Sequence, residues 1–313
     1  MLTNGPNLRD RVVIATERLA AGREKLRKRH AKHSPGVQVC NAVTDLIDHV
    51  ILELYESALR DLDDDSGELR SNIALVAHGG YGRRDMAPFS DVDLMILHTP
   101  AVADRISGIA GRMLRDVGDS GLSVGHSVRT PSQAISLGIK DPVIGTSLME
   151  SRLLAGDEAF FKGFLRRYRR KAQGCFKRLL AAIGESRDQE RSHYGETVHL
   201  LEPNVKRSQG GLRDVHLLRW IGFARHGTPD PERLRMMGAV DDDDYRKFRA
   251  AHEFLLRLRN DMHFRSGRAH DLLDRAEQLR VAEAFGFEGD AGALPVERFM
   301  QEYFRHTRAV SGL

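Results

Sequence analysis

The chain has 313 residues, of which 41% are hydrophobic and 29% are charged, so it can form one large or two ordinary globular domains. It shows no run of about 18 apolar residues, no signal peptide and only two distant cysteines, Cys40 and Cys175, so we expect a cytoplasmic protein without a membrane partner or a disulfide framework. The net charge of +4 favours anionic ligands such as nucleotides, whereas interleaved charges and 6% aromatic residues argue against nucleic acid.

Two amphipathic helices are predicted before the first strand, at residues 8–32 and 37–62, and they are expected to form an antiparallel pair. The segment His33–Gly36 breaks the helical pattern between them. The apolar positions that carry the pattern are Leu8, Val12, Leu19, Leu26, Val43, Ile47, Val50, Ile51 and Leu54. The acidic stretch from Asp61 to Glu68 is predicted to be a polar loop that leads into the next strands.

Two aspartates lie at the start of the second of two consecutive predicted strands. The first strand runs from Ile73 to His78, and Asp91 and Asp93 open the second. Because side chains alternate along a strand, both carboxylates are expected on one face. Paired carboxylates suit Mg²⁺, with Mn²⁺ as an alternative, and leave room for substrate phosphates. A hairpin with a polar face would account for either aspartate alone, but the whole spacing favours a metal site.

The glycine pair after the first strand predicts a phosphate-binding turn. Gly79 and Gly80 have no Cβ and so allow backbone N–H groups to approach phosphate oxygens. Ser90 adds a hydroxyl donor just before the first aspartate. The stretch fits neither a Walker loop, which needs Gly-Lys-Ser/Thr, nor a dinucleotide fingerprint, which needs a glycine where Asp85 stands.

Beyond these strands, residues 101–117 are predicted to form a helix on the sheet and residues 122–128 a third strand. After Pro131 the pattern is helical almost without interruption. Breaks are expected at Gly156, Gly174, Gly184, Pro203, Gly210-Gly211, Gly227 to Pro231, and Gly286. The cationic run at residues 166–171 is interpreted mainly as the solvated face of an amphipathic helix, with contact to an acidic partner or nucleotide as the alternative.

The segment 79–94 resembles the nucleotidyltransferase motif of the DNA polymerase β superfamily, and within it of the bacterial PII uridylyltransferase/uridylyl-removing enzymes. Segments 124–130, 201–206 and 210–214 are similar to further signatures of that family. The resemblance covers nearly the whole chain, but only the amino-terminal part of the family protein. Pattern and resemblance together imply an α+β fold with an amino-terminal helical pair at residues 1–62, a small mixed-sheet catalytic module at 63–140 and a helical domain at 141–313.

The resemblance also implies a second part of the nucleotide site, in the helical domain. Lys206 and Arg213 flank a glycine-containing loop that can present cations and N–H donors to a triphosphate. The residues implied to close over the nucleotide are Asn204, Lys206, Gly210, Gly211 and Arg213. A helix-to-helix turn with ordinary surface charges is the alternative. Glu202 and Asp214 flank the loop and could bind metal or pair with its cations.

Two features bear on which reactions to expect. His270-Asp271, in a predicted helical segment, is interpreted as a chance match to a metal phosphohydrolase motif, so uridylyl-removing activity is not expected. The hydrolase and ligand-sensing regions of longer relatives are expected to lie outside these residues, in a truncated chain or a short relative. Superfamily members usually have a third carboxylate on a neighbouring strand, but the corresponding residues here, Ser123 and Gly125, are not acidic. The metal site would then be completed by Asp119, by water or by an acid of the helical domain.

The resemblance implies transfer of UMP from UTP to a tyrosine of the PII nitrogen-signalling protein, with release of pyrophosphate. One metal ion is expected to be held by Asp91 and Asp93, and a second to bind the triphosphate. The choice of base and acceptor comes from the resemblance alone. Two alternatives are a nucleotide-binding regulatory module with weak or lost transfer, and a nucleotidyltransferase with another acceptor, such as a nucleic acid or an antibiotic-like molecule.

Overall fold

The structure is a computed structural model that describes residues 8–61, 67–195 and 197–312, with the side chains of 8–10 left out. The interior of the predicted acidic loop and the predicted side chain of Leu8 therefore lie outside the described residues. The chain forms two compact units. The first comprises residues 1–32, 41–86 and 90–171, and the second comprises 33–40, 87–89 and 172–313. The three-part functional division at residues 62 and 140 stays a prediction.

The first unit is built on a four-stranded mixed sheet in the order β3-β2-β1-β4. Its strands are β1 (Ile73–Ala77), β2 (Val92–His98), β3 (Val124–Arg129) and β4 (Arg152–Gly156). β1 is antiparallel to β2 and β4, whereas β2 is parallel to β3. All five residues of β1 are buried, as expected of a central strand covered on both faces. The mixed sheet confirms the predicted α+β class.

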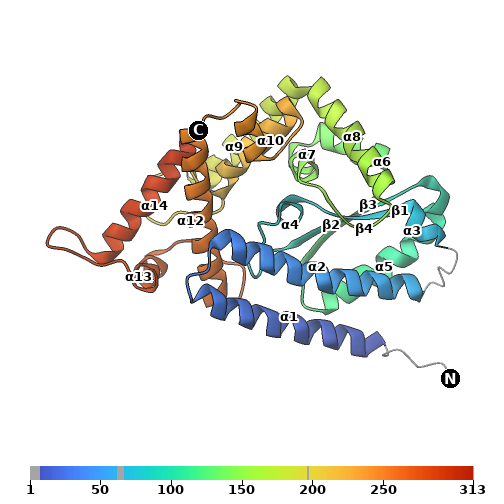
Figure 1. The fold of residues 1–313 in the computed structure, drawn as a ribbon, viewed down its shortest axis with the longest axis horizontal. Helices are drawn as coiled ribbons and strands as arrows, with labels where there is room; N and C mark the ends of the chain where they lie inside the picture. Colours follow the sequence, from blue (N-terminus) through green and yellow to red (C-terminus); the bar gives the residue numbers. More distant parts are fainter. Residues whose placement is uncertain (1–7, 62–66, 196, 313) are drawn as a thin grey trace. The chain divides into compact units, whose positions relative to one another are not determined.

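Helices surround this sheet in the first unit (Figure 1). They are α1 (Leu8–His30), α2 (Gly36–Arg60, whose first turn belongs to the second unit), α3 (Glu68–Asn72), α4 (Gly79–Arg83), the short 3-10 helix η1 (Pro100–Val102), α5 (Ala103–Asp119), α6 (Pro131–Lys140), α7 (Pro142–Met149) and α8 (Glu158–Gly174). α1 and α2 run side by side in opposite directions, which confirms the predicted pair. Their predicted apolar positions Leu19, Leu26, Ile47 and Ile51 are buried.

Local sequence signals explain where α6 and α7 begin. Thr130 and Gln133 form a capping box at the start of α6, and a proline occupies its first turn. The carboxylate of Asp141 accepts hydrogen bonds from two backbone N–H groups at the start of α7. Along α8, the basic residues at 166, 167 and 169–171 are exposed and Tyr168 is buried, which confirms the solvated helix face.

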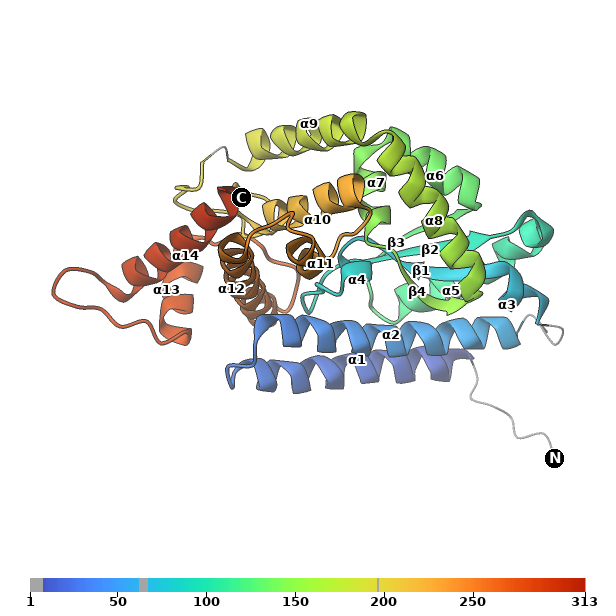
Figure 2. The same cartoon turned by 45° about the horizontal axis from the view of Figure 1, so that its top comes forward.

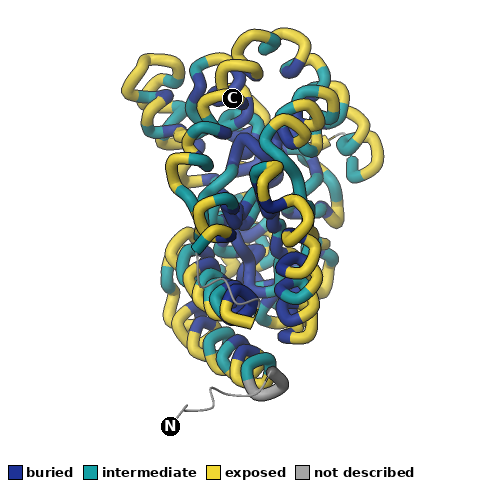
Figure 3. Tube along the Cα trace, turned by 90° about the vertical axis from the view of Figure 1, so that its right-hand side faces the viewer, coloured by how far each residue is buried: buried dark blue, intermediate teal, exposed yellow. Residues whose placement is uncertain are grey.

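The helices of the second unit are α9 (Phe176–Tyr194), α10 (Leu212–His226), α11 (Pro231–Met236), α12 (Asp242–Ser266), α13 (Arg275–Ala284) and α14 (Pro295–Ser311). α14 packs against both α12 and α13 (Figure 2). The core of this unit includes Leu255, Met262, Phe299 and Tyr303. Figure 3 shows buried and exposed stretches following one another along the helical turns of the chain.

Three sequence predictions are corrected by the structure. The chain after Pro131 is not purely helical, because the short segment Arg152–Gly156 adds the edge strand β4. Gly184 does not break a helix but lies inside α9, where packing overrides its weak helix propensity. His270 and Asp271 follow α12 rather than lying in a helix, because Gly267 ends α12 with a φ of 65°.

No helix among the described residues has the length and apolar character needed to cross a bilayer.

Candidate active site

The predicted catalytic motif spans the end of β1, the one-turn helix α4 and the start of β2. The N–H of His78, just after β1, donates to the carbonyl of Asp93 on β2 at 3.1 Å. Asp93 is paired in register with Gly125 on β3. The predicted glycine turn is therefore the first turn of α4, and it lies beside the strand that carries Asp93.

The carboxylate of Asp93 lies in a space that two glycines leave open. A Cβ built on Gly79 would be 2.8 Å from Oδ2 of Asp93, and a Cβ built on Gly125 would be 3.0 Å from Oδ1. Gly79 also has a φ of 57°, which disfavours other residues. A Cβ on Gly80, in contrast, would meet only the end of Arg83, at 3.8 Å. Of the glycine pair, Gly79 is the member whose missing side chain makes room for Asp93.

The other predicted members of this motif lie close in sequence but differ in exposure. Asp91 is exposed and precedes β2 by one residue, whereas Asp93 is half-buried within the strand. Ser90 is half-buried. The prediction placed both aspartates inside the strand, whereas β2 begins at Val92 and leaves Asp91 just before it. That the two carboxylates share one cation stays a prediction.

A further polar pair beside Asp93 could not be predicted from the sequence. Nδ1 of His78 is 2.6 Å from Oγ of Ser147 on α7. The same Oγ would lie 2.9 Å from a Cβ on Gly79. Burial lowers the pKa of His78, while the negative charge of Asp93 raises it in part. Ser147 is 69 residues away in a predicted helical region, so only the fold reveals the contact.

The loop after α4 is held by ion pairs within the first unit. Nε of Arg83 is 2.8 Å from Asp85, and both side chains are almost fully buried. Arg84 has a φ of 67° and its guanidinium reaches Asn41 and Asp45 on α2. Such a strained non-glycine residue persists only where its surroundings hold it. These contacts explain why the basic residues follow the glycines in the motif.

Among the described residues, no third carboxylate forms a metal-binding group with Asp91 and Asp93. Asp119 is exposed at the end of α5. Within residues 8–61, 67–195 and 197–312, no group of three His, Cys, Asp or Glu side chains is arranged to hold a metal ion. Gly125 stands directly opposite Asp93 on the neighbouring strand. A side chain at this position would crowd the Asp93 carboxylate, which accounts for the glycine.

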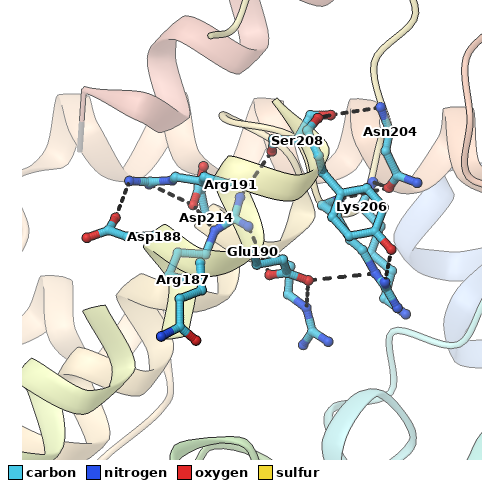
Figure 4. Close-up of polar contacts among 12 residues, drawn as sticks. Arg187, Asp188, Glu190, Arg191, Asn204, Lys206, Ser208 and Asp214 are labelled. Carbon is cyan, nitrogen blue, oxygen red and sulfur yellow. Dashed lines mark hydrogen bonds and ion pairs between the residues drawn. The ribbon is translucent and has the colours of Figure 1, made fainter. Parts of the chain in front are cut away.

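The second predicted loop, in the helical unit, is stabilised by its own side chains (Figure 4). Oδ1 of Asn204 accepts from the backbone N–H groups of Lys206 and Arg207, at 3.1 and 2.9 Å. Oγ of Ser208 accepts from the N–H of Asn204 at 2.8 Å. Asn204 therefore shapes this turn through an Asx-type contact, a local role that its predicted nucleotide role did not include.

Cations gather around Lys206. Burial, together with the neighbouring charges of Arg259 and Arg213, lowers the pKa of Lys206 to about 8, against the opposing effect of Asp271. Nε of Arg213 is 3.6 Å from Glu190, and its guanidinium lies 6.0 Å from the ring centre of Trp220. A half-buried lysine among arginines is the environment expected where an anion binds, although local ion pairs neutralise part of the charge.

The glycines of this loop have structural reasons of their own. Gly210 has a φ of 74°, and a Cβ there would overlap the backbone carbonyl of Thr307. A Cβ on Gly211 would lie 2.7 Å from the carbonyl of Val205. The predicted glycine pair therefore allows backbone to pack on backbone.

Asp214 neutralises cations rather than lying free. Its Oδ1 is 2.7 Å from Nε of Arg187 and 3.0 Å from Arg191, and its Oδ2 accepts from the N–H of Gly210 at 2.7 Å (Figure 4). Of the two roles left open for Asp214, the structure shows ion pairing.

Asp271 is likewise occupied by neighbours. Its Oδ1 is 2.7 Å from Nε of Arg259 and 3.0 Å from Nε2 of His263. Burial alone would raise the pKa of Asp271, but the hydrogen bond with His263 and the charge of Arg259 lower it well below its usual value. This carboxylate is the centre of an ion-pair cluster.

Residues 178–313 match the family model described as GlnD PII-uridylyltransferase. The chain is 34% identical over 308 residues to the bifunctional uridylyltransferase/uridylyl-removing enzyme of Caulobacter vibrioides, covering 96% of this chain and 32% of that protein. The enzyme of the same name from Burkholderia vietnamiensis is 37% identical over 275 residues, with 87% and 31% covered. The chain thus spans about a third of the length of the curated relatives it matches. The predicted resemblance is confirmed: residues 178–313 match the GlnD PII-uridylyltransferase family model, and most of the chain is similar to bifunctional uridylyltransferase/uridylyl-removing enzymes.

Proposed function

We propose that this chain is a nucleotidyltransferase that transfers UMP from UTP to a tyrosine hydroxyl of the PII signalling protein and releases pyrophosphate. The observation that carries the proposal is the carboxylate of Asp93, which lies between Gly79 and Gly125 beside a one-turn helix. Uridylyl transfer, as opposed to another nucleotidyl transfer, is supported by the names of the relatives.

The donor set at the start of β2 fits a divalent cation. Asp91 and Asp93 supply hard carboxylate oxygens, and the space left by Gly79 and Gly125 keeps bulky side chains away from Asp93. Mg²⁺ is commonly bound by one or two carboxylates and completed by substrate phosphates and water, with Mn²⁺ as the alternative. We propose that Asp91 and Asp93 hold this cation.

The chain's own residues would act by positioning and by neutralising charge. When bound, the cation would stabilise charge on the phosphate and favour the ionised acceptor hydroxyl. Asp93 would be held in place by its strand and by the glycines beside it. The N–H groups at the start of α4 and the hydroxyl of Ser90 would donate to phosphate oxygens. Lys206 and Arg213 are proposed to add positive charge toward the triphosphate.

The test is to incubate the chain with Mg²⁺, PII and each nucleoside triphosphate in turn, and to measure the intact mass of PII. We expect a UMP adduct with UTP alone, located on a tyrosine by peptide mapping. An adduct with a different nucleotide would correct the base, and labelled nucleotide found in RNA but not in protein would correct the acceptor. Asp104→Asn, an exposed acid in the first turn of α5, is the matched control and should leave the adduct unchanged.

A nucleotide-binding regulatory module is the second candidate. It is favoured by Gly125, which occupies the strand position directly opposite Asp93 where an acidic residue would complete a three-carboxylate site. Calorimetric binding of Mg²⁺-UTP without any adduct on PII would support this candidate over transfer.

A further inference from the structure

His78 and Ser147 form a polar pair beside Asp93 that the proposed function does not use. Nδ1 of His78 and Oγ of Ser147 are 2.6 Å apart. His78 directly follows β1, whereas Ser147 lies in α7, so the pair joins the sheet to a helix of the same unit. The backbone N–H of His78 also donates to the backbone carbonyl of Asp93. His78 is therefore linked both to the hydroxyl of Ser147 and to the strand that carries Asp93.

The two oxygens of the Asp93 carboxylate have different surroundings. Oδ2 borders the space above Gly79, and Oγ of Ser147 borders the same space, at 2.8 and 2.9 Å from a Cβ placed there. Oδ1 instead faces Gly125, an exposed residue on the edge strand β3. Oδ2 thus borders the turn after β1, near Ser147 of α7, whereas Oδ1 borders Gly125 on the edge strand.

We propose that His78 and Ser147 are positioning residues for Asp93, which fix its Oδ2 on the inner side and present its Oδ1 to a divalent cation. The inference rests on the proposed function only in taking Asp93 as a cation ligand. On this proposal, the hydroxyl of Ser147, which borders the same space as Oδ2, would limit the rotation of the carboxylate. The contact between Nδ1 of His78 and that hydroxyl would hold the hydroxyl in place.

The physical reason is the cost of ordering a ligand. A carboxylate that rotates freely must lose that freedom when it binds a cation, whereas a carboxylate already held in one orientation does not. Removing a residue that orients a metal ligand generally weakens metal affinity by about 10-fold to 100-fold. A serine hydroxyl is neutral, so this arrangement orders Asp93 without adding a negative charge beside it.

The test measures binding of Mn²⁺ alone to the full chain, by electron paramagnetic resonance of the free ion, so that no turnover is needed. We expect Asp93→Asn to abolish the site and Ser147→Ala to raise its Kd by about 10-fold to 100-fold. Ser151→Ala is the matched control, because its Oγ lies four residues along the chain, is buried and has no hydrogen-bond partner in the described structure. Its Kd should equal that of the unaltered chain.

Variants of His78 separate positioning from a purely structural role. His78→Asn places an amide near the position of Nδ1 and should retain most of the affinity. His78→Leu should weaken Mn²⁺ binding as Ser147→Ala does. The double variant His78→Leu/Ser147→Ala should bind Mn²⁺ no more weakly than either single variant, because both substitutions remove the same constraint. Thermal melts of each variant give an independent readout of folding.

The outcomes distinguish this inference from the proposed function. If Mn²⁺ binding depends on Asp93 and Ser147 but PII is never modified, the proposed transfer is wrong and the positioning pair stands. If PII is modified and folded Ser147→Ala binds Mn²⁺ as tightly as the unaltered chain, the positioning pair is wrong. An unaltered chain that binds no Mn²⁺ through Asp93 would also overturn the inference.

Discussion

The two glycine pairs of this chain, Gly79-Gly80 and Gly210-Gly211, follow the same sequence logic but differ in what they accommodate. Gly79 makes room for a carboxylate oxygen and a serine hydroxyl. Gly210 and Gly211 make room for backbone carbonyls of residues 205 and 307. A glycine pair therefore predicts a close approach, but not whether a reactive group or plain backbone is approaching.

The charged residues around the two pairs differ in the same way. Beside Gly79, the Asp93 carboxylate borders two glycines, with Oδ2 near Gly79 and Oδ1 near Gly125. Beside Gly210, Asp214 is already neutralised by two arginines. We propose catalysis for the first loop and, through Lys206 and Arg213, the placement of positive charge for the second.

The largest effect is expected when either of the two cationic side chains of the second loop is removed. Lys206→Ala and Arg213→Ala should each weaken Mg²⁺-UTP binding by about 1.5–3 kcal/mol, the range for hydrogen bonds to charged groups. Isothermal titration calorimetry measures the change, and Arg233→Ala, an exposed arginine on α11, is the matched control. Unaltered affinity together with a lowered melting temperature would leave the loop with structural duties alone.

The first loop is tested by treating its two glycines separately. Gly79→Ala should lower the free energy of unfolding by about 1–2 kcal/mol more than Gly80→Ala, because it combines a left-handed backbone with contact to Asp93 and Ser147. Urea denaturation followed by circular dichroism provides the two values. Equal stabilities would show that the space beside Gly79 is not constrained by Asp93.

Lys206 predicts a pH dependence of stability. Its pKa is lowered to about 8 in the folded chain, so the unfolded chain binds more protons between that pH and the ordinary lysine pKa. The contribution of Lys206 to stability therefore rises with pH in this window. Lys206→Met should melt at a higher temperature than the unaltered chain below pH 8, and the difference should shrink toward pH 10. A difference that is constant with pH would contradict the lowered pKa.

The smallest expected effect concerns uridylyl removal. Asp271 is held by Arg259 and His263, so it is not available as the metal ligand that a His-Asp hydrolase pair requires. These 313 residues should therefore release no UMP from modified PII with Mn²⁺, at any glutamine concentration, as followed by chromatography of free UMP. Mn²⁺-dependent release would return His270 and Asp271 to the list of candidate catalytic residues.

Features that depend on neighbours in the chain were predictable from the sequence. The helical period of the apolar residues predicted α1 and α2, and the run of apolar residues before Gly79 predicted β1. β4 was missed because its five residues carry too short a pattern to stand out from the helices around it. Gly184 was misjudged because helix propensity is a weak signal when the helix face is packed.

The candidate site was predictable to the same extent. Strand alternation and the motif predicted Asp91 and Asp93; Asp93 lies in β2 and Asp91 just before it, and their catalytic role stays a prediction. The pair of His78 and Ser147 could not be found in this way, because their contact depends on how α7 packs near the end of β1. The charged neighbours of Lys206 could not be predicted for the same reason, since Arg259 lies on α12, far along the sequence.

The most direct test of the central claim compares the unaltered chain with Asp93→Asn in the presence of Mg²⁺, UTP and PII. Asparagine has nearly the same shape but lacks the charge, so melting temperature and circular dichroism should show an intact fold. Intact-mass analysis of PII should show a UMP adduct with the unaltered chain and a rate at least about 100-fold lower with the variant. An adduct formed equally fast by a folded Asp93→Asn chain would contradict the account.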